Sequence, residues 1–554
     1  MSNSGTAHGR TGCARFPALK TMSRLCGDRK DSNMNEQMRS RIDSIFHLWT
    51  QGICPGGQVL IRKGGETVYE RCFGYADIEN RVPITSDTVF HVASVSKQFT
   101  VMGVMLLSRD GLVDLDSDIR TYIPEYVGFP DTVTVRDLMN NDSGIWDLFE
   151  FQDLQGISND DITTQRYALK MIPRQNALDF PPRSRYLYCN SNFILLAAIA
   201  EKVSGKSLRE FLDERIFRPL GMTKTVVRDR YWECIDGRAK SFLDNGTQFF
   251  YNPLVYGIYG ATSLHTTARD LAKWMENYRN PTICPEDVIR EMTTVAKLTG
   301  GAPTTYACGL WVGQLEGHRC FQHVGEDAGF RTIVYRLPDD DIDIIILSNT
   351  QNTFTEPSAQ AIARIMLGLP EAKKPEMPVR EAFDLAEAPG FYYAELPQSA
   401  IIRIEERDGT LYRMEKYGPA PLTRVRGNLF RMGHLETYLL LGAENPMLFT
   451  PEETICLRKA ADEPLPEEQL QRYAGRYYCE KLETFYTVRA CGGALYMEQM
   501  RRGQTLLHAA GEDRFVTEYP RSCFVQFVKD DAGEVSGLIF SGTRIARMPF
   551  KKLS

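Results

Sequence analysis

The chain has 554 residues, of which 43% are hydrophobic and 25% are charged, as is typical of a globular protein with several domains. A formal net charge of −6 argues against nucleic acid or an anionic membrane as the main partner. No apolar run approaches the roughly 20 residues that a membrane-spanning helix needs.

The first 34 residues differ from the rest of the chain. They carry several basic residues, Arg10 and Arg24 among them, and few acidic ones, but they lack the apolar stretch of a secretion signal. A targeting presequence and a disordered extension both fit this composition. We interpret residues 1–34 as a disordered extension, with the folded part opening near Met34.

The folded part begins with a helix, a hairpin and a second helix. Apolar residues recur at helical spacing over Asn35–Thr50. Two strands follow, Gly57–Arg62 and Thr67–Cys72, close enough in sequence to form an antiparallel hairpin. The next helix begins near Ser94 and stops at Asp110-Gly111.

The middle of the chain, from about 120 to 250, is mostly helical and loop-like. A helix over Arg269–Tyr278 precedes three strands, Gly309–Gln314, Arg331–Leu337 and Ile342–Leu347, of which the last two form a hairpin. This order of elements predicts one antiparallel sheet built from both ends of an α/β domain, flanked by helices and interrupted by a helical insert.

The remainder of the chain repeats itself at a period of about 85 residues. Gly390–Tyr393 with Asp408–Tyr412 matches Gly475–Tyr478 with Gly492–Tyr496. Short alternating strands separated by turns surround both copies. We therefore expect two small antiparallel β-barrel domains after the α/β domain.

These elements divide the chain beyond the extension into a domain, a linker and two barrels. Pro, Lys and Glu are frequent over Pro370–Pro378, as in a linker. The expected boundaries are 35–367 for the α/β domain, 368–380 for the linker, 381–461 for the first barrel and 465–554 for the second.

Cysteines and histidines give no sign of a bound metal. The 13 cysteines are an odd set without a Cys-x-x-Cys pair, and the eight histidines lack metal-ligand spacing. We therefore predict no metal and no cofactor. Scattered free thiols are typical of a reducing compartment, so we expect a cytoplasmic protein.

A serine and a lysine three residues apart, Ser94 and Lys97, stand at the start of the second helix. Positions i and i+3 share one helix face, so the lysine can lie beside the hydroxyl at a helix N-terminus that favours negative charge. A lysine can take the serine proton if burial and nearby cations lower its pKa. By itself this short pattern also occurs by chance, and a solvent-facing helix start explains it equally well.

Two further motifs lie downstream, Tyr188-Cys189-Asn190 and His323-Val324-Gly325. Ser-x-x-Lys, Tyr-x-Asn and His-x-Gly in this order resemble the serine β-lactamase and penicillin-recognising hydrolase superfamily, in particular its class C-like branch. The resemblance covers roughly residues 36–367. With two trailing barrels, the overall plan is similar to that of the D-aminopeptidases of this superfamily.

The resemblance implies a role for each motif residue. Ser94 would be the nucleophile that forms an acyl-enzyme, and Lys97 with Tyr188, held near the phenolate, would take its proton and return it to the leaving group. Asn190 would orient Lys97 and the acyl side of the substrate. Backbone N–H groups of Ser94 and Glu326 would form the oxyanion hole, in which one donor is worth roughly 10²–10³ in rate.

The third motif holds His323 and Gly325, where many superfamily members carry lysine before the glycine. An imidazole is uncharged for much of the time near pH 7, so it would attract a substrate carboxylate weakly, which favours an aminopeptidase over a β-lactamase. Three residues have ordinary alternatives: Tyr188 as a packed aromatic, His323 as a core histidine and Cys189 as a structural thiol. Asn141-Asp142 departs from the His-Thr pair frequent in the superfamily and leaves the packing of that loop open.

A loop from the last barrel is a further expectation of the resemblance. In the D-aminopeptidases such a loop reaches the active site and limits it to small substrates that carry a free amine. The comparable region is Arg501–Asp513, in which Glu512 or Asp513 would be the carboxylate that binds the amine.

Three functions are compatible with these motifs. The first is a D-aminopeptidase that releases N-terminal D-residues from small peptides, amides or esters. The second is a promiscuous esterase or D,D-carboxypeptidase-like hydrolase. The third is a non-catalytic scaffold, against which the intact Ser94, Lys97 and Tyr188 argue. We expect a small-molecule or short-peptide substrate as partner, no nucleic-acid or membrane partner, and allow for a homodimer.

Overall fold

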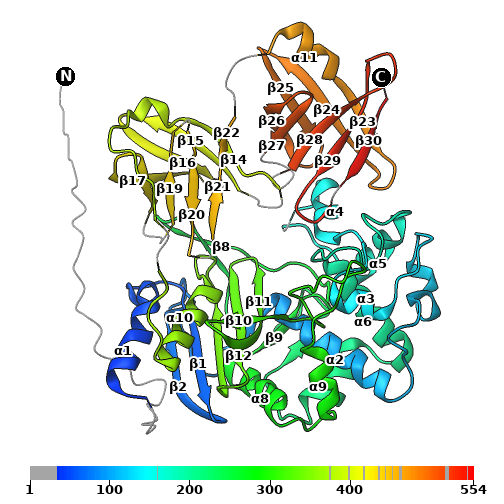
Figure 1. Cartoon of the computed structure of the whole chain (residues 1–554), viewed down its shortest axis with the longest axis vertical. Helices are drawn as coiled ribbons and strands as arrows, with labels where there is room; N and C mark the ends of the chain where they lie inside the picture. The colour runs from blue at the N-terminus through cyan, green and yellow to red at the C-terminus, as the bar shows by residue number, and fades with distance from the viewer. Residues whose placement is uncertain are drawn as a thin grey trace, which may run out of the picture.

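An α/β part and two β-barrels make up the described chain, with both barrels above the α/β part in the view of Figure 1. The predicted extension lies outside the described residues except for Met34, which is buried. The computed structural model describes residues 34–158, 160–373, 376–396, 400–415, 418–433, 437–442, 444–451, 453–460, 465–517, 523–545 and 547–553.

The α/β part contains a six-stranded antiparallel sheet in the order β10-β11-β12-β13-β1-β2. The N-terminal hairpin joins the late strands through β1 and β13, which pair Leu60 with Ile345, so both ends of the domain build one sheet, as predicted. The strands are β1 (Gly57–Lys63), β2 (Glu66–Phe73), β10 (Trp311–Leu315), β11 (His318–Asp327), β12 (Phe330–Leu337) and β13 (Ile342–Ser348).

Strand β11 is absent from the sequence prediction, which recognised three late strands where the structure has four. Its buried positions include the polar Gln322 and His323, so the strand lacks the apolar run that marks its neighbour β13. This correction matters because β11 carries the third motif.

Helices cover both faces of the sheet. On one face, α1 (Glu36–Ile45) and α10 (Thr355–Leu367) pack against apolar side chains of β12 and β13. On the other face lie α2 (Ser96–Arg109) and α8 (Ala268–Arg279). Every residue of β13 is consequently buried.

The insert is organised around α6 (Asn190–Ser204), which packs against α2 and is buried from Asn190 to Ala200. It ends at Gly205, whose positive φ of 69° suits a helix C-cap and agrees with the predicted helix end. The other helices of the α/β part are α3 (Val135–Asn140), α4 (Leu148–Leu154), α5 (Gln165–Met171), α7 (Leu208–Leu212) and α9 (Glu286–Met292). The short strands are β3 (Tyr75–Asp77), β4 (Val82–Pro83), β5 (Phe90–His91), β6 (Val226–Val227), β7 (Phe242–Asp244), β8 (Phe249–Tyr251) and β9 (Leu264–Thr266).

The first barrel is one nine-stranded sheet whose edge strands, β21 and β22, are separated by a single residue, Leu457, so the sheet is nearly closed. The second barrel is closed and is preceded by α11 (Glu467–Tyr473). First-barrel strands are β14 (Gly390–Tyr393), β15 (Ile401–Arg407), β16 (Thr410–Glu415), β17 (Gly418–Arg426), β18 (Leu429–Met432), β19 (Tyr438–Leu440), β20 (Met447–Phe449), β21 (Thr454–Cys456) and β22 (Arg458–Lys459). Second-barrel strands are β23 (Gly475–Cys479), β24 (Thr484–Cys491), β25 (Ala494–Gln499), β26 (Gly503–Gly511), β27 (Arg514–Thr517), β28 (Cys523–Lys529), β29 (Val535–Ser541) and β30 (Met548–Lys552).

The sequence repeat corresponds to equivalent positions in the two barrels. Its first half is the first strand of each barrel, and its second half contains the turn between the next two strands. Tyr392 donates its hydroxyl to the carbonyl oxygen of Ala388 at 2.8 Å, and Tyr477 makes the same four-residue contact to Tyr473 at 2.6 Å. The prediction of two related barrels is confirmed.

The second barrel contacts the C-terminal end of α4 (Figure 1). The Tyr486 hydroxyl donates to the carbonyl oxygen of Leu154 at 2.9 Å, and Gln499 donates to that of Gln155 at 3.1 Å. The last carbonyls of a helix have no partner inside the helix. The barrel supplies these missing donors and is thereby fixed beside α4.

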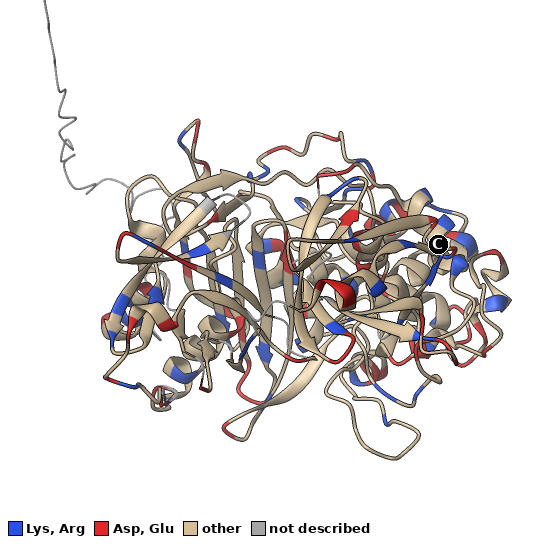
Figure 2. Cartoon of the chain, turned by 90° about the horizontal axis from the view of Figure 1, so that it is seen from above, with Lys and Arg blue, Asp and Glu red and all other residues tan. Residues whose placement is uncertain are grey.

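Two properties of the whole molecule complete the description. In the part of the chain that the structure describes, no helix is both long and apolar enough to cross a membrane. Figure 2 shows basic and acidic residues intermixed along the described ribbon.

Candidate active site

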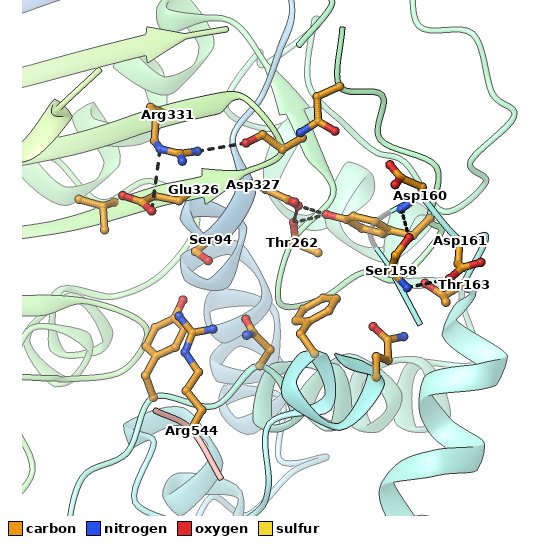
Figure 3. Close-up of a pocket in the computed structure, with 18 of the residues that line it drawn as sticks. Ser94, Ser158, Asp160, Asp161, Thr163, Thr262, Glu326, Asp327, Arg331 and Arg544 are labelled. Atoms are coloured by element: carbon orange, nitrogen blue, oxygen red, sulfur yellow. Dashed lines mark hydrogen bonds and ion pairs between the residues drawn. The ribbon is translucent and has the colours of Figure 1, made fainter. Parts of the chain in front are cut away.

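Ser94 lies in a short 3-10 turn, Ala93–Val95, between β5 and α2, and its side chain faces a cavity (Figure 3). Ala93 has a φ of +45°, a conformation that costs a non-glycine residue on the order of 1–3 kcal/mol. The Ser96 hydroxyl stabilises the turn, because it donates to the carbonyl oxygen of Ala93 at 2.5 Å and accepts the N–H of Leu264 at 3.0 Å. The turn therefore presents Ser94 from a fixed backbone.

Lys97 is fully buried beneath Ser94. Its Nζ lies 3.0 Å from Ser94 Oγ, 2.9 Å from Asn190 Oδ1 and 2.7 Å from the carbonyl oxygen of Ala261. Burial, followed by the nearby charge of Arg544, lowers the pKa of Lys97 well below its usual range. A neutral amine has two N–H groups and one lone pair. In that neutral form, with both N–H groups donated to Asn190 and Ala261, the lone pair would be left for the Ser94 hydroxyl.

Asn190 is oriented by an aspartate that the sequence analysis missed. Asp147 Oδ2 accepts both the backbone N–H of Asn190, at 2.7 Å, and its side-chain amide, at 2.8 Å. Since the amide nitrogen is held by Asp147, the amide oxygen is the atom that faces Lys97. Asp147 Oδ1 also caps α4 by accepting the N–H of Phe149 at 3.0 Å, so one side chain fixes both α4 and Asn190.

Tyr188 is held between aromatic and cationic groups. Its ring stacks on Trp311 at 5.5 Å between centroids with planes 7° apart, and Lys97 Nζ lies 4.9 Å from its centroid. Burial raises the pKa of Tyr188 above its usual range, even though a hydrogen bond with Ser94 lowers it in part. The raised pKa favours a neutral phenol at Tyr188 over the expected near-phenolate, so the phenol could pass on a proton while Lys97 takes the part of the base.

His323 does not line the cavity. It is fully buried, with Nδ1 2.6 Å from the carbonyl oxygen of Val324 and Nε2 3.0 Å from the Tyr306 hydroxyl. Burial lowers the pKa of His323 to about 3, so the ring is neutral across the physiological range. This geometry matches the core-histidine alternative. The ring supports Trp311, whose centroid lies 4.8 Å away, and through it Tyr188.

Gly325 brings β11 against the segment that carries Ser94. A Cβ atom at this position would lie 2.2 Å from the carbonyl oxygen of Val92 and 2.3 Å from Thr332 Oγ1. Thr332 donates to the same carbonyl of Val92 at 3.0 Å. Only a glycine permits this approach, which places the next residue, Glu326, in the cavity wall with Ser94.

The cavity above Ser94 has a volume of about 620 Å³. It brings Ser94, Tyr188, Asn190 and Glu326 together and leaves Lys97 and His323 beneath the surface. The acidic residues around it are Asp160, Asp161, Glu326 and Asp327, and the basic ones are Arg331 and Arg544.

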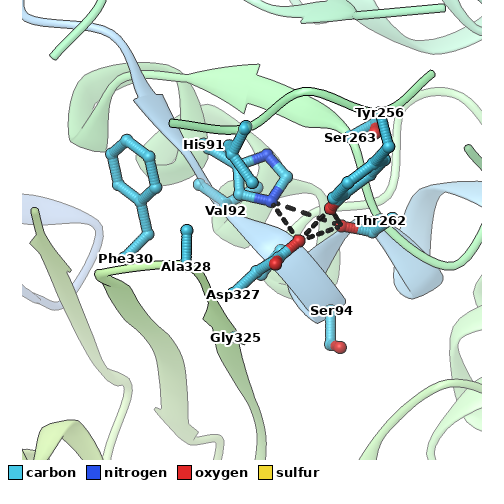
Figure 4. A network of polar contacts seen from close by, with 12 residues as sticks. His91, Val92, Ser94, Tyr256, Thr262, Ser263, Gly325, Asp327, Ala328 and Phe330 are labelled. Carbon is cyan, nitrogen blue, oxygen red and sulfur yellow. Dashed lines mark hydrogen bonds and ion pairs between the residues drawn. The ribbon is translucent and has the colours of Figure 1, made fainter. Parts of the chain in front are cut away.

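Asp327 anchors a polar network in the wall beside Ser94 (Figure 4). It accepts hydrogen bonds from His91 Nε2 at 3.1 Å, from Thr262 Oγ1 at 3.3 Å and from the Tyr256 hydroxyl. Burial raises the pKa of Asp327, but the hydrogen bond and charge of His91 with the two hydroxyls outweigh it, so the pKa lies below its usual range. An ionised Asp327 ties the β11–β12 turn to the short strand before Ser94.

Asn141 connects the loop after α3 with the second motif. Its side-chain oxygen accepts the backbone N–H of Cys189 at 3.2 Å and the amide of Asn192 at 3.0 Å. The pair Asn141-Asp142 therefore packs against the motif, which answers the question that its departure from the superfamily pattern raised. Cys189 is buried, and burial raises the pKa of its thiol, as in a structural cysteine.

A loop of the second barrel does enter the cavity, but it is the segment 542–545 between β29 and β30. Thr543 Oγ1 and the backbone N–H of Arg544 donate to Glu150 Oε1 of α4 at 2.6 and 2.8 Å. The Arg544 guanidinium lies 5.0 Å from the Tyr188 ring centroid and points toward Ser94 in Figure 3. Sequence reasoning could not find this contact, because almost 400 residues separate Arg544 from Glu150.

The predicted region Arg501–Asp513 is only partly at the site. Arg501 pairs with Asp161 on the cavity rim at 2.6 Å. Asp513 lies beyond the other end of β26, where it accepts from the Tyr473 hydroxyl at 2.6 Å and pairs with Lys529 at 2.6 Å. Neither Glu512 nor Asp513 lines the cavity, so the expectation that one of them binds a substrate amine is wrong.

Docking of the barrel loop should depend on pH. Burial raises the pKa of Glu150 to about 7, above the roughly 4.3 of an unfolded glutamate. The folded state therefore holds this proton more tightly, and its stabilisation is fully present below about pH 4 and is lost as pH rises through about 7. Because Glu150→Gln cannot ionise, we expect its melting temperature, relative to wild type, to be higher at pH 8 than at pH 5. The exposed Glu534→Gln serves as control, and an equal offset at both pH values would contradict the expectation.

Among the described residues, no group of three or more His, Cys, Asp or Glu side chains is arranged to hold a metal ion. The chemistry available to the site is that of a buried lysine, a serine hydroxyl, a phenol and backbone N–H groups. Such a set can move a proton from the serine to a leaving group while the serine oxygen attacks a carbonyl.

The fold and the site together define a hydrolase with the penicillin-binding-protein-like architecture. The Beta-lactamase family matches residues 42–366, more than half of the chain, and the chain belongs to this family. Two relatives are named D-aminopeptidase. The one from Gluconobacter oxydans is 27% identical over 450 residues, which cover 80% of this chain and 83% of the relative. The one from Brucella ovis is 28% identical over 522 residues, which cover 90% and 96%.

Solved structures share the fold. The octameric penicillin-binding protein homologue from Pyrococcus abyssi aligns with a TM-score of 0.54 and 23% identity over 76% of this chain and 99% of that one. The D-amino acid amidase from Ochrobactrum anthropi SV3, complexed with D-phenylalanine, aligns with a TM-score of 0.51 and 23% identity over 60% and 99%. The resemblance to this superfamily, its fold class and its enzymatic nature are thereby confirmed: the protein is a hydrolase.

Proposed function

We propose that this chain is a D-aminopeptidase that releases N-terminal D-residues from small peptides, amides or esters through an acyl-enzyme on Ser94. The observation that carries the proposal is the buried Lys97, whose Nζ lies 3.0 Å from Ser94 Oγ while its N–H groups have other acceptors. That arrangement activates a serine without a histidine or a metal ion. The names of the two relatives support the choice of substrate.

Acylation follows from this geometry. Ser94 Oγ attacks the substrate carbonyl as Lys97 Nζ takes the hydroxyl proton, and the carbonyl oxygen, now negative, is stabilised by the backbone N–H groups of Ser94 and Glu326. The proton then moves through Tyr188 to the leaving nitrogen, so that the C–N bond breaks and the amine departs. A water molecule then attacks the ester carbonyl as Lys97 and Tyr188 take up its proton, the bond between the acyl carbon and Ser94 Oγ breaks, the proton returns to Oγ, and the acyl group leaves as a carboxylic acid.

A free α-amine requires negative charge near the acyl side of the substrate. With Glu512 and Asp513 remote, the carboxylates available for it are those that line the cavity, namely Asp160, Asp161 and Glu326. Asp161 already pairs with Arg501. We therefore assign the amine to the acidic rim that Asp160 and Glu326 form with Asp161, although Glu326 lies 3.9 Å from Arg331 Nε, because the attraction of several carboxylates for an amine does not require one ideal geometry.

Compartment and assembly form part of the proposal. The scattered cysteines favour the reducing cytoplasm, and Cys54, Cys189 and Cys308 are among the free thiols of the described residues. The substrate is a small molecule or short peptide, and self-association into a homodimer fits a family in which a structural relative is described as octameric.

The test is hydrolysis of paired D- and L-alanine p-nitroanilides and of p-nitrophenyl acetate by the purified protein, with Ser94→Ala as control. We expect the D-anilide to be cleaved at least about 10-fold faster than the L-anilide, since one well-placed contact that only one enantiomer makes is worth about 1.4 kcal/mol or more. Turnover of the acetate alone, still dependent on Ser94, would instead identify an esterase. A folded protein that a fluorophosphonate does not label would identify a scaffold.

A further inference from the structure

Arg544 lies close to Tyr188 in the cavity, but the catalytic steps described above give it no role. Its guanidinium lines the cavity and lies 5.0 Å from the ring of Tyr188, the residue assigned to protonate the leaving group. Whatever extends from the leaving nitrogen must therefore pass close to Arg544. The loop that carries Arg544 is fixed by two hydrogen bonds to Glu150, so the position of its backbone is set before substrate binds.

The charge of Arg544 is not matched by an ion pair within the described residues. The two carboxylates whose charges act on it, Asp147 and Glu150, have other hydrogen-bond partners: Asp147 accepts from Asn190 and Phe149, and Glu150 accepts from Thr543 and the backbone of Arg544. Both raise the pKa of Arg544 against the effect of burial, so it is charged throughout the working pH range.

The second cationic residue of the cavity differs from Arg544 in this respect. Arg331 donates Nη1 to the carbonyl oxygens of Ala328 and Phe330, and its Nε lies 3.9 Å from Glu326. Its guanidinium thus serves the β11–β12 turn. Among the described residues that line the cavity, Arg544 is the cation whose side chain has no hydrogen bond or ion pair to protein.

We propose that Arg544 binds a carboxylate in the leaving group, so that the favoured substrates are dipeptides and other short peptides whose C-terminal carboxylate lies next to the scissile bond. In a dipeptide the carboxyl carbon is two bonds from the leaving nitrogen, which Tyr188 serves. A guanidinium binds a carboxylate through two parallel N–H···O bonds, a geometry that an amide or an ester alkyl group cannot reproduce. The inference rests on the proposed acyl-enzyme chemistry at Ser94 and specifies its substrate class.

The cavity then has two charged ends that suit a zwitterion. The acidic rim at Asp160 and Glu326 faces the α-amine, while Arg544 faces the carboxylate beyond the scissile bond. Chain length follows from this arrangement, because each further residue moves the carboxylate away from Arg544. Dipeptides should therefore be better substrates than tripeptides.

The experiment compares substrates that differ only in this charge: D-alanyl-glycine against D-alanyl-glycinamide, and O-acetylglycolate against O-acetylglycolamide. The enzymes are wild type, Arg544→Met and Arg544→Lys, with Arg547→Met as matched control, because Arg547 is exposed, close in sequence and absent from the cavity lining. We expect wild type to prefer the carboxylate of each pair by about 10- to 100-fold in kcat/KM. Arg544→Met should reduce this ratio to near one, Arg544→Lys should restore part of it, and Arg547→Met should keep it.

The other outcomes distinguish a failure of the Arg544 proposal from a failure of the aminopeptidase proposal. If Arg544→Met lowers kcat/KM for both members of a pair equally, or moves the acidic limb of the pH profile without changing the ratio, Arg544 tunes Lys97 and does not bind substrate. The ester pair needs no D-amino acid, so cleavage of the esters with the expected ratio, but not of the peptides, supports Arg544 and overturns the aminopeptidase. Cleavage of neither pair overturns both.

Discussion

Replacing Lys97 with methionine should lower kcat/KM for every acyl substrate by at least about 10³-fold, as expected when the base of a serine nucleophile is removed. Lys97 Nζ lies 3.0 Å from Ser94 Oγ, and its burial lowers its pKa well below the usual range, which favours the neutral amine that a base requires. Methionine has a similar length and no charge, so it removes the base and leaves the buried volume filled. Single-turnover acylation by a fluorophosphonate, with circular dichroism to confirm folding, measures the loss at the first step.

Lys97→Arg separates the role of a base from that of a positive charge. A guanidinium stays protonated in a protein, so it can supply charge but cannot accept the serine proton. If Lys97 is the base, Lys97→Arg should be as inactive as Lys97→Met. Substantial activity in the arginine variant would show that Lys97 acts through its charge and that another group takes the proton.

Gly325→Ala should cost roughly 10² or more in kcat/KM, because the added Cβ would meet the backbone carbonyl of Val92 at 2.2 Å. The carbonyl cannot rotate away, since Thr332 donates to it, and β11 cannot shift without disturbing its pairing with β12. The strand must therefore move away from the Ser94 turn. The two backbone N–H groups assigned to the oxyanion hole would then no longer converge on one oxygen.

Gly313→Ala is the matched control, because Gly313 lies on β10 of the same sheet and a Cβ there meets nothing within 4 Å. It should keep both activity and melting temperature close to wild type. The kinetic signature of Gly325→Ala is a loss concentrated in kcat, with fluorophosphonate labelling slowed in parallel. A loss confined to KM would instead place Gly325 in substrate binding and contradict the assignment.

The parts of the site that sequence could predict are those set by local geometry. Ser94 and Lys97 are three residues apart at a helix start, and their proximity follows from the helical repeat. The closure of one sheet by both ends of the domain followed from the order of elements, and the barrels followed from a repeat whose tyrosines make the same hydrogen bond, at Tyr392 and Tyr477.

The rest depends on contacts between distant segments. Asp147 orients Asn190 across 43 residues, and Arg544 reaches the cavity from the second barrel, so neither has a local pattern that marks its role. The burial of His323 was open for a different reason. The sequence His-x-Gly is the same whether the imidazole faces the substrate or packs on Trp311. The buried position of the ring follows from its hydrogen bond with the Tyr306 hydroxyl, which the sequence does not reveal.

Because a loop of the second barrel lines the cavity, substrate selectivity can evolve separately from the residues that carry the reaction. The residues to which we assign the reaction belong to the α/β part, whereas Arg544 reaches the cavity from segment 542–545, a short connection on a separate closed barrel. A substitution there leaves Ser94 and its neighbours in place, and connections on a rigid scaffold tolerate change better than packed strands do. New substrate ranges can thus arise from substitutions in one loop while the contact between Ser94 and Lys97 stays in place.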